Sequence, residues 1–226
     1  MTKYFLLFIL IAMSCATIAQ NKIDNVNYGS RTDVKQFYKI ISFGDKIDFG
    51  NIDASVRWTI TNSVEGISEI LNGNQINNYS FQQQGEYVVR FSEVKKDAEV
   101  CDHAPFEEKM IIKVNPIKLS FDFSKIKFSE VIQRDKSYDD LIIVIPVTIT
   151  TKDNLITKLT APGLSIAGIG VSLTAKPLNG EVEVKNGIQL LKYKVSGIVN
   201  KETYLMFDFY DFNNQVQTYN LSQIIN

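Results

Sequence analysis

Cys101, Asp102 and His103 are the one place in the sequence where residue types that could perform catalysis stand side by side. A cysteine nucleophile needs a base that generates the thiolate and donors that hold the developing oxyanion. Cys101 and His103 would point to the same side of a strand. However, Pro105 indicates a loop, and a nucleophile and its base normally come from different elements. Zinc needs about four ligands, and this segment supplies two. We therefore predict a surface loop with one modestly reactive thiol.

Carboxylate pairs are the next candidates for chemistry. Asp139 and Asp140 are adjacent, so their side chains would point apart on an extended chain, and we expect a solvated turn ahead of a buried strand. Asp208 and Asp211 could form a second pair, but glycosidase chemistry requires two carboxyl groups that face each other across a cleft. His103 is the single histidine, and no Gly-x-Ser-x-Gly elbow accompanies it. We predict no catalytic residue and no enzyme; the alternative is a hydrolase with an accessory domain.

Oxygen-bearing side chains also gather near the end of the chain. Asp208, Asp211, Asn213 and Asn214 could place oxygens around a hairpin turn, and Ca²⁺ takes six to eight oxygen ligands. Their spacing matches no loop signature such as Asp-x-Asp-x-Asp-Gly, and asparagine in turns is explained by its tolerance of left-handed backbone. We therefore predict no cofactor and no bound metal, and keep calcium at these four residues as the alternative.

Composition and charge narrow the classes of function. The chain has 226 residues, is 45% hydrophobic and 11% aromatic, and carries 24 Lys and Arg against 25 Asp and Glu. These values are typical of a globular protein and argue against wholesale disorder or several membrane spans. Non-specific nucleic-acid binding needs a basic surface, which a formal charge of −1 does not provide. We predict no nucleic-acid partner.

The first residues have the three parts of a secretory signal peptide. Lys3 supplies the charge, residues 5–13 form an apolar stretch, and Thr17-Ile18-Ala19 is a small-x-small cleavage site before Gln20. The apolar stretch is shorter than the about 20 residues that a spanning helix needs. We predict a signal peptide at residues 1–19, a flexible leader at residues 20–36, and export to the periplasm, the outer membrane surface or the extracellular space.

Cys15 offers a second processing route. Ala12-Met13-Ser14-Cys15 is similar to a bacterial lipobox, in which the cysteine is lipidated, although alanine stands where leucine is usual. The membrane becomes a partner only if Cys15 carries this anchor. Either route removes or modifies Cys15 and leaves Cys101 as the one free thiol, so no intramolecular disulfide is expected.

Apolar residues alternate with polar ones from Phe37 onward. Val56, Trp58 and Ile60 share one side of such a segment. This period of two predicts half-buried strands, and the frequent turn residues between them predict antiparallel β-sandwiches. The segments that follow this pattern are residues 55–61, 86–91 and 110–114 in a first set, and residues 117–123, 141–149, 191–195, 205–209 and 215–221 in a second set, the last two joined by a turn at Asn213-Asn214.

Three positions interrupt this strand pattern. Pro116 follows Asn115 and cannot donate to a strand ladder, so we place a domain boundary there, between residues 37–115 and residues 116–226. Pro146 predicts that its part of the strand lies at an edge or a bulge. Residues 64–71 are the one stretch expected to make a helical turn.

The first set also carries a family pattern. It has Trp58 in a mid-domain strand and, downstream, Gly85-Glu86-Tyr87-Val88-Val89-Arg90-Phe91. These residues resemble bacterial immunoglobulin-like domains of the polycystic-kidney-disease (PKD) type. The resemblance implies that Gly85 and Tyr87 form a tyrosine corner, in which the tyrosine hydroxyl bonds to nearby backbone, and that Val89 stands where antibody domains have a disulfide cysteine. Such modules act as spacers or binding units.

The second set has a further resemblance at its end. The segment Tyr204-Leu205-Met206-Phe207-Asp208-Phe209-Tyr210-Asp211-Phe212-Asn213-Asn214-Gln215-Val216-Gln217 is similar to the last hairpin of the TraQ family of conjugal transfer proteins. That resemblance implies, as an alternative function, an accessory envelope component of a conjugative transfer apparatus.

The fold class predicted from these features is all-β, with two tandem immunoglobulin-like antiparallel β-sandwich domains after an N-terminal signal peptide. The predicted function is that of a non-enzymatic envelope or cell-surface protein that serves as a structural or binding module for a protein or glycan partner. Tyr28, Asn77 and Tyr138 lie near loops and are expected to be exposed and available for recognition.

Overall fold

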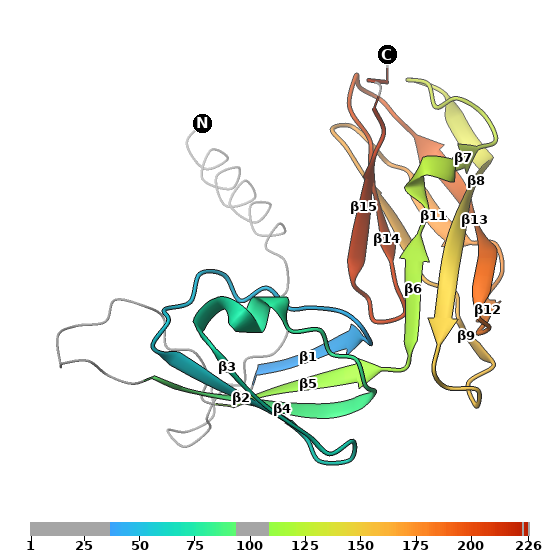
Figure 1. The fold of residues 1–226 in the computed structure, drawn as a ribbon. Coiled ribbons are helices and arrows are strands. Elements are labelled where there is room, and N and C mark those ends of the chain that lie inside the picture. The colour runs from blue at the N-terminus through green and yellow to red at the C-terminus, as the bar shows by residue number, and fades with distance from the viewer. Residues whose placement is uncertain (1–36, 94–108, 223, 226) are drawn as a thin grey trace, which may run out of the picture. The chain divides into compact units, whose positions relative to one another are not determined.

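The computed structural model describes residues 37–93, 109–222 and 224–225. Most of these residues are in strands, and the helical elements among them are two short 3-10 helices, so the all-β class is confirmed (Figure 1). No helix in this part of the chain is long and apolar enough to cross a membrane. The expectations for the signal peptide, the leader with Tyr28, the lipidation of Cys15, and the Cys101–His103 segment fall outside the described residues.

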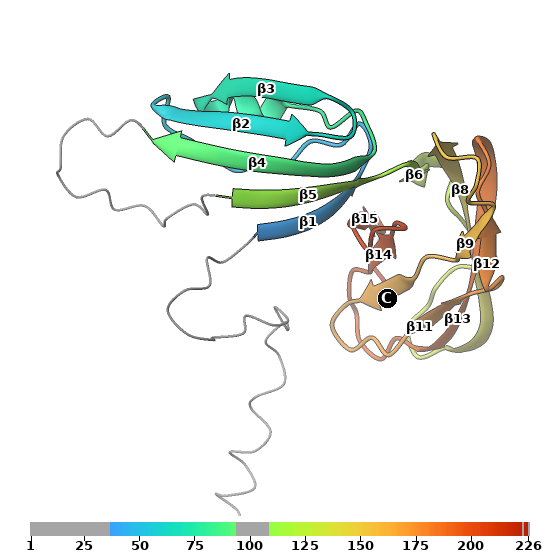
Figure 2. The same cartoon turned by 90° about the horizontal axis from the view of Figure 1, so that it is seen from below.

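Five strands from the first half of the chain form one sheet. Its order is β1-β5-β4-β2-β3, and Figure 2 shows the strands in this sequence. β1 runs parallel to β5, and the remaining neighbours are antiparallel. The bounds are Phe37–Ser42 for β1, Val56–Asn62 for β2, Ile67–Asn72 for β3, Gly85–Glu93 for β4 and Lys109–Asn115 for β5.

The predicted alternation is confirmed in this sheet. Trp58 and Ile60 of β2 and Tyr87 and Val89 of β4 are all buried, while Arg57 on the intervening position of β2 is exposed. One face of the sheet therefore supplies a hydrophobic core, as the period of two requires.

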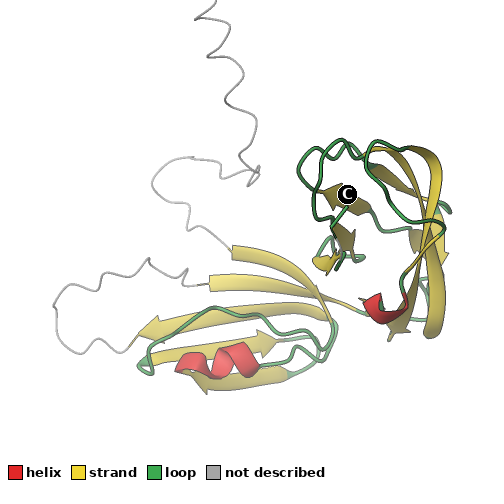
Figure 3. Ribbon diagram, turned by 90° about the horizontal axis from the view of Figure 1, so that it is seen from above, coloured by secondary structure: helices red, strands yellow, loops and turns green. Residues whose placement is uncertain are grey.

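The far side of this core differs from the sandwich that we expected. In the described residues, it is covered by the 3-10 helix η1 (Gly73–Asn78) and by irregular segments, which contribute Ile47, Ile52, Ile76 and Phe81. Figure 3 shows η1 lying over the sheet. These irregular segments are joined by a backbone hydrogen bond from the Phe81 N–H to the Asp45 carbonyl at 3.1 Å. Further along, asparagine side chains accept the backbone hydrogen bonds that a neighbouring strand would accept in a sheet: Asn77 Oδ1 accepts from Phe49 N at 2.8 Å and Asn74 Oδ1 from Ile52 N at 2.7 Å.

The expected helical turn at residues 64–71 is wrong. Asn62 is buried, and its Oδ1 accepts hydrogen bonds of 3.2 Å from the backbone of Val64 and Glu65. Gly66 then takes a φ of 66°, which turns the chain back. The following residues pair with β2 as strand β3. A side-chain cap at the start of the turn therefore favoured a hairpin over a helix.

Two sheets and a ribbon form the second half. One sheet has the order β11-β13-β8-β6, with β7 also on β8, and the other has the order β10-β14-β15, while β12 pairs with β9. The elements are β6 (Ile117–Phe121), η2 (Phe123–Lys125), β7 (Lys127–Phe128), β8 (Ser137–Thr151), β9 (Lys158–Thr160), β10 (Leu164–Ala167), β11 (Thr174–Pro177), β12 (Glu181–Glu183), β13 (Gly187–Ile198), β14 (Met206–Tyr210) and β15 (Val216–Asn220).

The two sheets of this half face each other across a second core. The inward residues of β8 and β13 meet those of β14, and the rings of Tyr193 and Phe209 lie 5.6 Å apart between their centroids. The predicted inward set of β8 is confirmed, because every second residue from Leu141 to Ile149 is buried. This half therefore has the layered arrangement of a β-sandwich.

Pro146 lies inside its sheet and not at an edge or a bulge, so that expectation is wrong. It is a register partner of Leu190 on β13, and on the other side its carbonyl accepts from Asp122 N at 2.9 Å. Another residue at this position would donate its backbone N–H to the Asp122 carbonyl, and proline has no N–H to donate. That carbonyl accepts instead from Lys125 N at 3.2 Å within η2. The 3-10 turn thus satisfies the group that a proline leaves unpaired.

The hydrophobic residues separate into two clusters along the chain. One cluster spans residues 41–114 and the other residues 117–225. Between them, β5 ends at Asn115 and β6 begins at Ile117, so Pro116 alone joins the two strands. Residues from 36 onward also form one compact unit.

Candidate binding site

The residues of the PKD-type pattern have structural positions in the first core. Tyr87 is buried, its hydroxyl donates to the Gln83 carbonyl, and the hydroxyl oxygen accepts from Gln83 N, both at 3.2 Å. Gly85 has a φ of 111°, which turns the chain into β4. Trp58 is fully buried and donates from Nε1 to the Gly73 carbonyl at 3.0 Å. Val89 is buried two residues after Tyr87. These groups hold the core and are not available to a partner.

Three of the four residues considered for calcium have hydrogen-bond partners within the protein. Asp208 Oδ1 accepts from the Thr218 hydroxyl at 2.6 Å across the hairpin. Asp211 is buried at the turn, where its Oδ1 accepts from the backbone of Asn213 at 2.7 Å and of Gln215 at 2.8 Å. Asn214 takes a φ of 59°, as a turn requires. In the part of the chain that is described, no three His, Cys, Asp or Glu side chains are placed to hold a metal.

Asn213 is engaged at the junction of the two cores. Its Nδ2 donates to the Ser42 hydroxyl at 2.8 Å, and its Oδ1 accepts from Asn115 Nδ2. Gln215 Nε2 donates to the Ile40 carbonyl at 2.9 Å. The Oδ1 of Asp211 thus caps the hairpin, and the Oδ1 of Asn213 links it to the first sheet.

Asp211 should make the stability of the protein depend on pH. Burial raises the pKa of its carboxyl above the ordinary value of 3.8, against the opposing effect of the two backbone N–H groups. The stability gained from this raised pKa is present at acidic pH and is lost as the pH rises through the folded-state pKa. Asp211→Asn keeps the acceptor oxygen without the charge. We expect its free energy of unfolding to exceed that of the wild type in urea titrations at pH 7, with a smaller difference at pH 4. An equal difference at both pH values would contradict this.

The remaining sequence candidates are also explained by the fold. Asp139 and Asp140 are exposed at the start of β8, where Asp140 pairs with Lys194. Tyr138 is buried, contrary to our expectation, and its hydroxyl accepts from Gln133 N at 2.7 Å. A bulge opposite the Val195–Gly197 segment of β13 changes the side-chain parity of β8 and turns Tyr138 inward. Asn77, half-buried, is held by Phe49 and Gly50.

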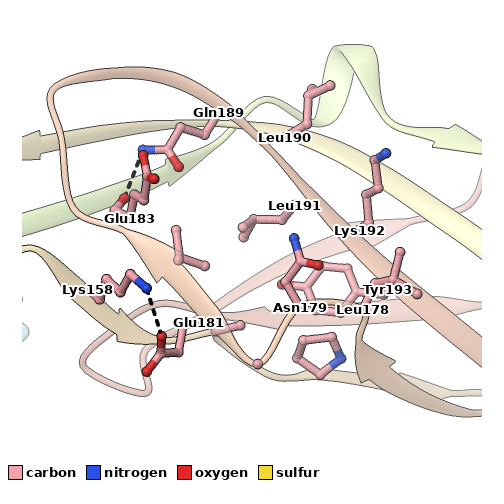
Figure 4. A pocket seen from close by; sticks show the side chains of 14 residues that line it. Lys158, Leu178, Asn179, Glu181, Glu183, Gln189, Leu190, Leu191, Lys192 and Tyr193 are labelled. Carbon is pink, nitrogen blue, oxygen red and sulfur yellow. Dashed lines mark hydrogen bonds and ion pairs between the residues drawn. The ribbon is translucent and has the colours of Figure 1, made fainter.

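A groove of about 700 Å³ lies beside β13 and is the strongest candidate for a binding site (Figure 4). β11 pairs with β13 as far as Pro177, after which the chain leaves β13 and pairs with β9 as β12. Leu178 N donates to the Lys192 carbonyl at 2.8 Å at one end of the groove. Gln189 Nε2 donates to the Glu183 carbonyl at 2.9 Å at the other end.

The backbone of Leu190 faces this groove. Its register partner Pro146 turns its carbonyl to Asp122, away from β13, so the two residues form a non-hydrogen-bonded pair. The N–H and C=O of Leu190 therefore point away from β8. Lys192, which has the same parity, directs its carbonyl to Leu178 on that side. Beyond Pro177 no described strand pairs with this edge of β13.

Tyr193 forms part of the groove lining and carries an unsatisfied hydroxyl. Its side chain is 1% exposed, and the hydroxyl has no hydrogen-bond partner among the described residues. Burial raises the pKa of this phenol well above its ordinary value, so it stays protonated and can donate. Leaving a buried hydroxyl without a partner costs about 1–3 kcal/mol of folding stability.

Lysines cluster on the outer face of the same sheet. Lys127 and Lys192 lie on either side of Val144, and Lys176 lies opposite Lys194 in the neighbouring row. All four lysines are exposed, and of them Lys194 has an ion pair, with Asp140, among the described residues. We call Lys127, Lys176, Lys192 and Lys194 the lysine face. Lys192 belongs to both this face and the groove.

The direct opposition of Lys176 and Lys194 should reduce stability. Like charges opposite each other across two strands are destabilising by about 0.2–1 kcal/mol. Lys176→Glu is therefore expected to raise the free energy of unfolding by about that amount in urea titrations at low salt. The gain should shrink in 1 M NaCl, because salt screens exposed charges. A loss of stability, or a gain that salt leaves unchanged, would contradict the electrostatic origin.

Neither the groove nor the lysine face was predicted from the sequence. The groove depends on where β11 leaves β13, and Pro177-Leu178-Asn179-Gly180 is the one local sign of that departure. The lysine face depends on the register between four strands, which no local pattern encodes.

No family model matches the chain, and no curated protein matches it.

Proposed function

We propose that the protein is an exported, non-enzymatic component of a bacterial envelope or cell surface, and that it binds a protein or glycan partner. The groove beside β13 carries this proposal. Its strand edge at Leu190 is not paired by any described strand, and Asn179 and Lys192 line the same hollow. Polar groups that a fold leaves unpaired in a concave site are suited to a ligand.

We further propose that the chain consists of two immunoglobulin-like domains. The order β1-β5-β4-β2-β3, the buried Trp58 on β2, and the bond from the Tyr87 hydroxyl to upstream backbone support an immunoglobulin-like first domain. The facing sheets of the second half support the same proposal there, and so does Tyr138, whose hydroxyl donates to the Val131 carbonyl at 3.2 Å. Rigid domains of this kind position a binding surface.

The non-enzymatic part of the proposal is supported by how the carboxylates are used. Asp211 caps a turn, Asp208 bonds to Thr218, and Asp140 pairs with Lys194. Around the groove, Glu181 pairs with Lys158 at 3.4 Å and Glu183 with Lys185 at 2.6 Å. Carboxyl groups neutralised in this way suit a binding surface better than acid–base chemistry.

Capture from envelope extract tests the binding function. The mature protein from Gln20 onward is immobilised beside two variants, Gly180→Trp and Val64→Trp. Gly180 lines the groove, has open space around it and does not have a left-handed φ, so a tryptophan there is expected to obstruct the groove without straining the backbone. Val64 is 85% exposed on the surface of the first half of the chain and serves as the matched control.

We expect the wild type and Val64→Trp to retain the same material in stoichiometric amounts, and Gly180→Trp to lose it. Retention by all three proteins would contradict a role for the groove. Turnover of any retained compound by the wild type alone would contradict the non-enzymatic function.

A further inference from the structure

We propose that the groove beside β13 binds one sugar unit of an acidic glycan, whose carboxylate lies against Lys192. This inference rests on the binding function proposed above and names the class of ligand for that site.

The shape of the groove favours a compact group over an extended peptide. A peptide that adds to a sheet as a strand needs an edge that is open along several residues. Here the edge is limited by the Leu178–Lys192 hydrogen bond at one end and by the Gln189–Glu183 hydrogen bond at the other. A ligand must therefore enter from the solvent side as a rounded group. A volume of about 700 Å³ is sufficient for a sugar ring with its substituents.

The polar groups of the groove match hydroxyl chemistry. The backbone of Leu190 offers one donor and one acceptor at the edge that no described strand pairs. Asn179 lines the groove with an amide that has both functions. Sugar hydroxyls also donate and accept at once, so they can satisfy these groups together. Leu178 and Leu191 provide apolar lining for the C–H face of a ring (Figure 4).

Charge at the rim selects an acidic sugar. The lysines Lys158 and Lys185 are neutralised by Glu181 and Glu183. Lys192 has no ion pair within the described residues and stands on β13 beside Leu190, at the border of the lysine face. A carboxylate on the bound sugar would meet this cation, and further carboxylates along a polymer would meet Lys127, Lys176 and Lys194. Repeated acidic units therefore fit the surface better than a neutral glycan.

Calorimetric titration of the mature protein with galacturonic acid tetramer, its methyl-esterified form and maltotetraose tests this inference. We expect the free acid to bind, and the two uncharged oligosaccharides to bind at least about tenfold more weakly, because a charge-assisted contact is lost. Raising the salt concentration should weaken binding of the free acid. Equal binding of all three oligosaccharides, or binding of none, would overturn the inference.

Variants separate a ligand contact from a structural effect. Lys192→Ala should weaken binding about tenfold, whereas Lys113→Ala, an exposed lysine of the first sheet, should leave it unchanged. Tyr193→Phe should leave binding unchanged, while the thermal midpoint stays equal or rises, since the buried hydroxyl has no partner among the described residues. Loss of binding in Lys113→Ala, or unchanged binding in Lys192→Ala, would contradict the assigned contact.

The capture experiment distinguishes failure of this inference from failure of the proposed function. Periodate treatment of the extract, which cleaves sugar diols, should abolish capture, and protease treatment should not. The reverse result would overturn the glycan inference while leaving a binding function through the groove. Capture that Gly180→Trp does not reduce would overturn both.

Discussion

Gly197→Ala is expected to unfold the second core under conditions in which the wild type is folded. Gly197 has a φ of 122°, a conformation that side chains rarely adopt. An added Cβ would overlap the Ser172 carbonyl oxygen and lie 2.9 Å from its carbon and 3.1 Å from Leu173 Cα. These are backbone atoms, so they cannot rotate away. Backbone strain and overpacking together should lower the free energy of unfolding by about 3 kcal/mol or more.

Urea unfolding followed by far-ultraviolet circular dichroism measures this loss. Gly180→Ala is the matched control, because a Cβ at Gly180 meets nothing within 4 Å; its effect should stay within about 0.5 kcal/mol. The fluorescence of Trp58, the single tryptophan, reports the first core separately. Similar stabilities for the two glycine variants would show that the bulge can relax, and would contradict the close approach described here.

Trp58→Ala is expected to lower the stability of the first core by a similar amount. The indole is fully buried, and its ring centroid lies 5.6 Å from that of Phe49 and 5.7 Å from that of Phe91. Truncating a buried tryptophan to alanine costs about 3–5 kcal/mol. The Gly73 carbonyl also loses its donor, which adds the desolvation cost of an unpaired acceptor.

Hydrogen exchange at the amides of Val89 and Ile112 measures this effect, since both residues belong to the first core. Trp58→Ala should remove most of their protection. Ile70→Ala, on the adjacent strand β3 with the side chain 53% exposed, should change it little. Equal protection in the two variants would mean that the far side of the core, formed by η1 and the irregular segments, carries the stability instead.

Much of the core could be predicted from the sequence, because strand periodicity is local. The alternation of Leu141, Ile143 and Ile145 with less apolar neighbours is sufficient to assign the buried side of β8. The same holds for Trp58 and Ile60 on β2. Burial follows from side-chain direction, and direction follows from the two-residue repeat of a strand.

The errors arose where distant residues decide the outcome. Tyr138 is buried because a bulge against Gly197, many residues away along the chain, changes its parity. Pro146 is accepted in a central strand because η2 supplies a donor for the Asp122 carbonyl. Residues 64–71 form a hairpin because Asn62 caps the turn. Periodicity contains no information about such partners.

The groove could not be predicted for a related reason. It exists because β11 leaves β13 after Pro177 and because Pro146 sets the direction of the Leu190 backbone. Only strand register brings these positions together. The inward parity of Tyr193 was predictable, but the lack of a partner for its hydroxyl was not.

The position of β5 between β1 and β4 has a consequence for how the chain folds as it is synthesised. β5 is the last strand of the first sheet to emerge, yet it occupies an interior position. Until β5 (Lys109–Asn115) has been synthesised, β1 has no neighbouring strand and one edge of β4 stays unpaired. Such non-local pairing is slow. Since Pro116 alone connects β5 to β6, the strand that completes the first layer is followed at once by the strand that begins the next.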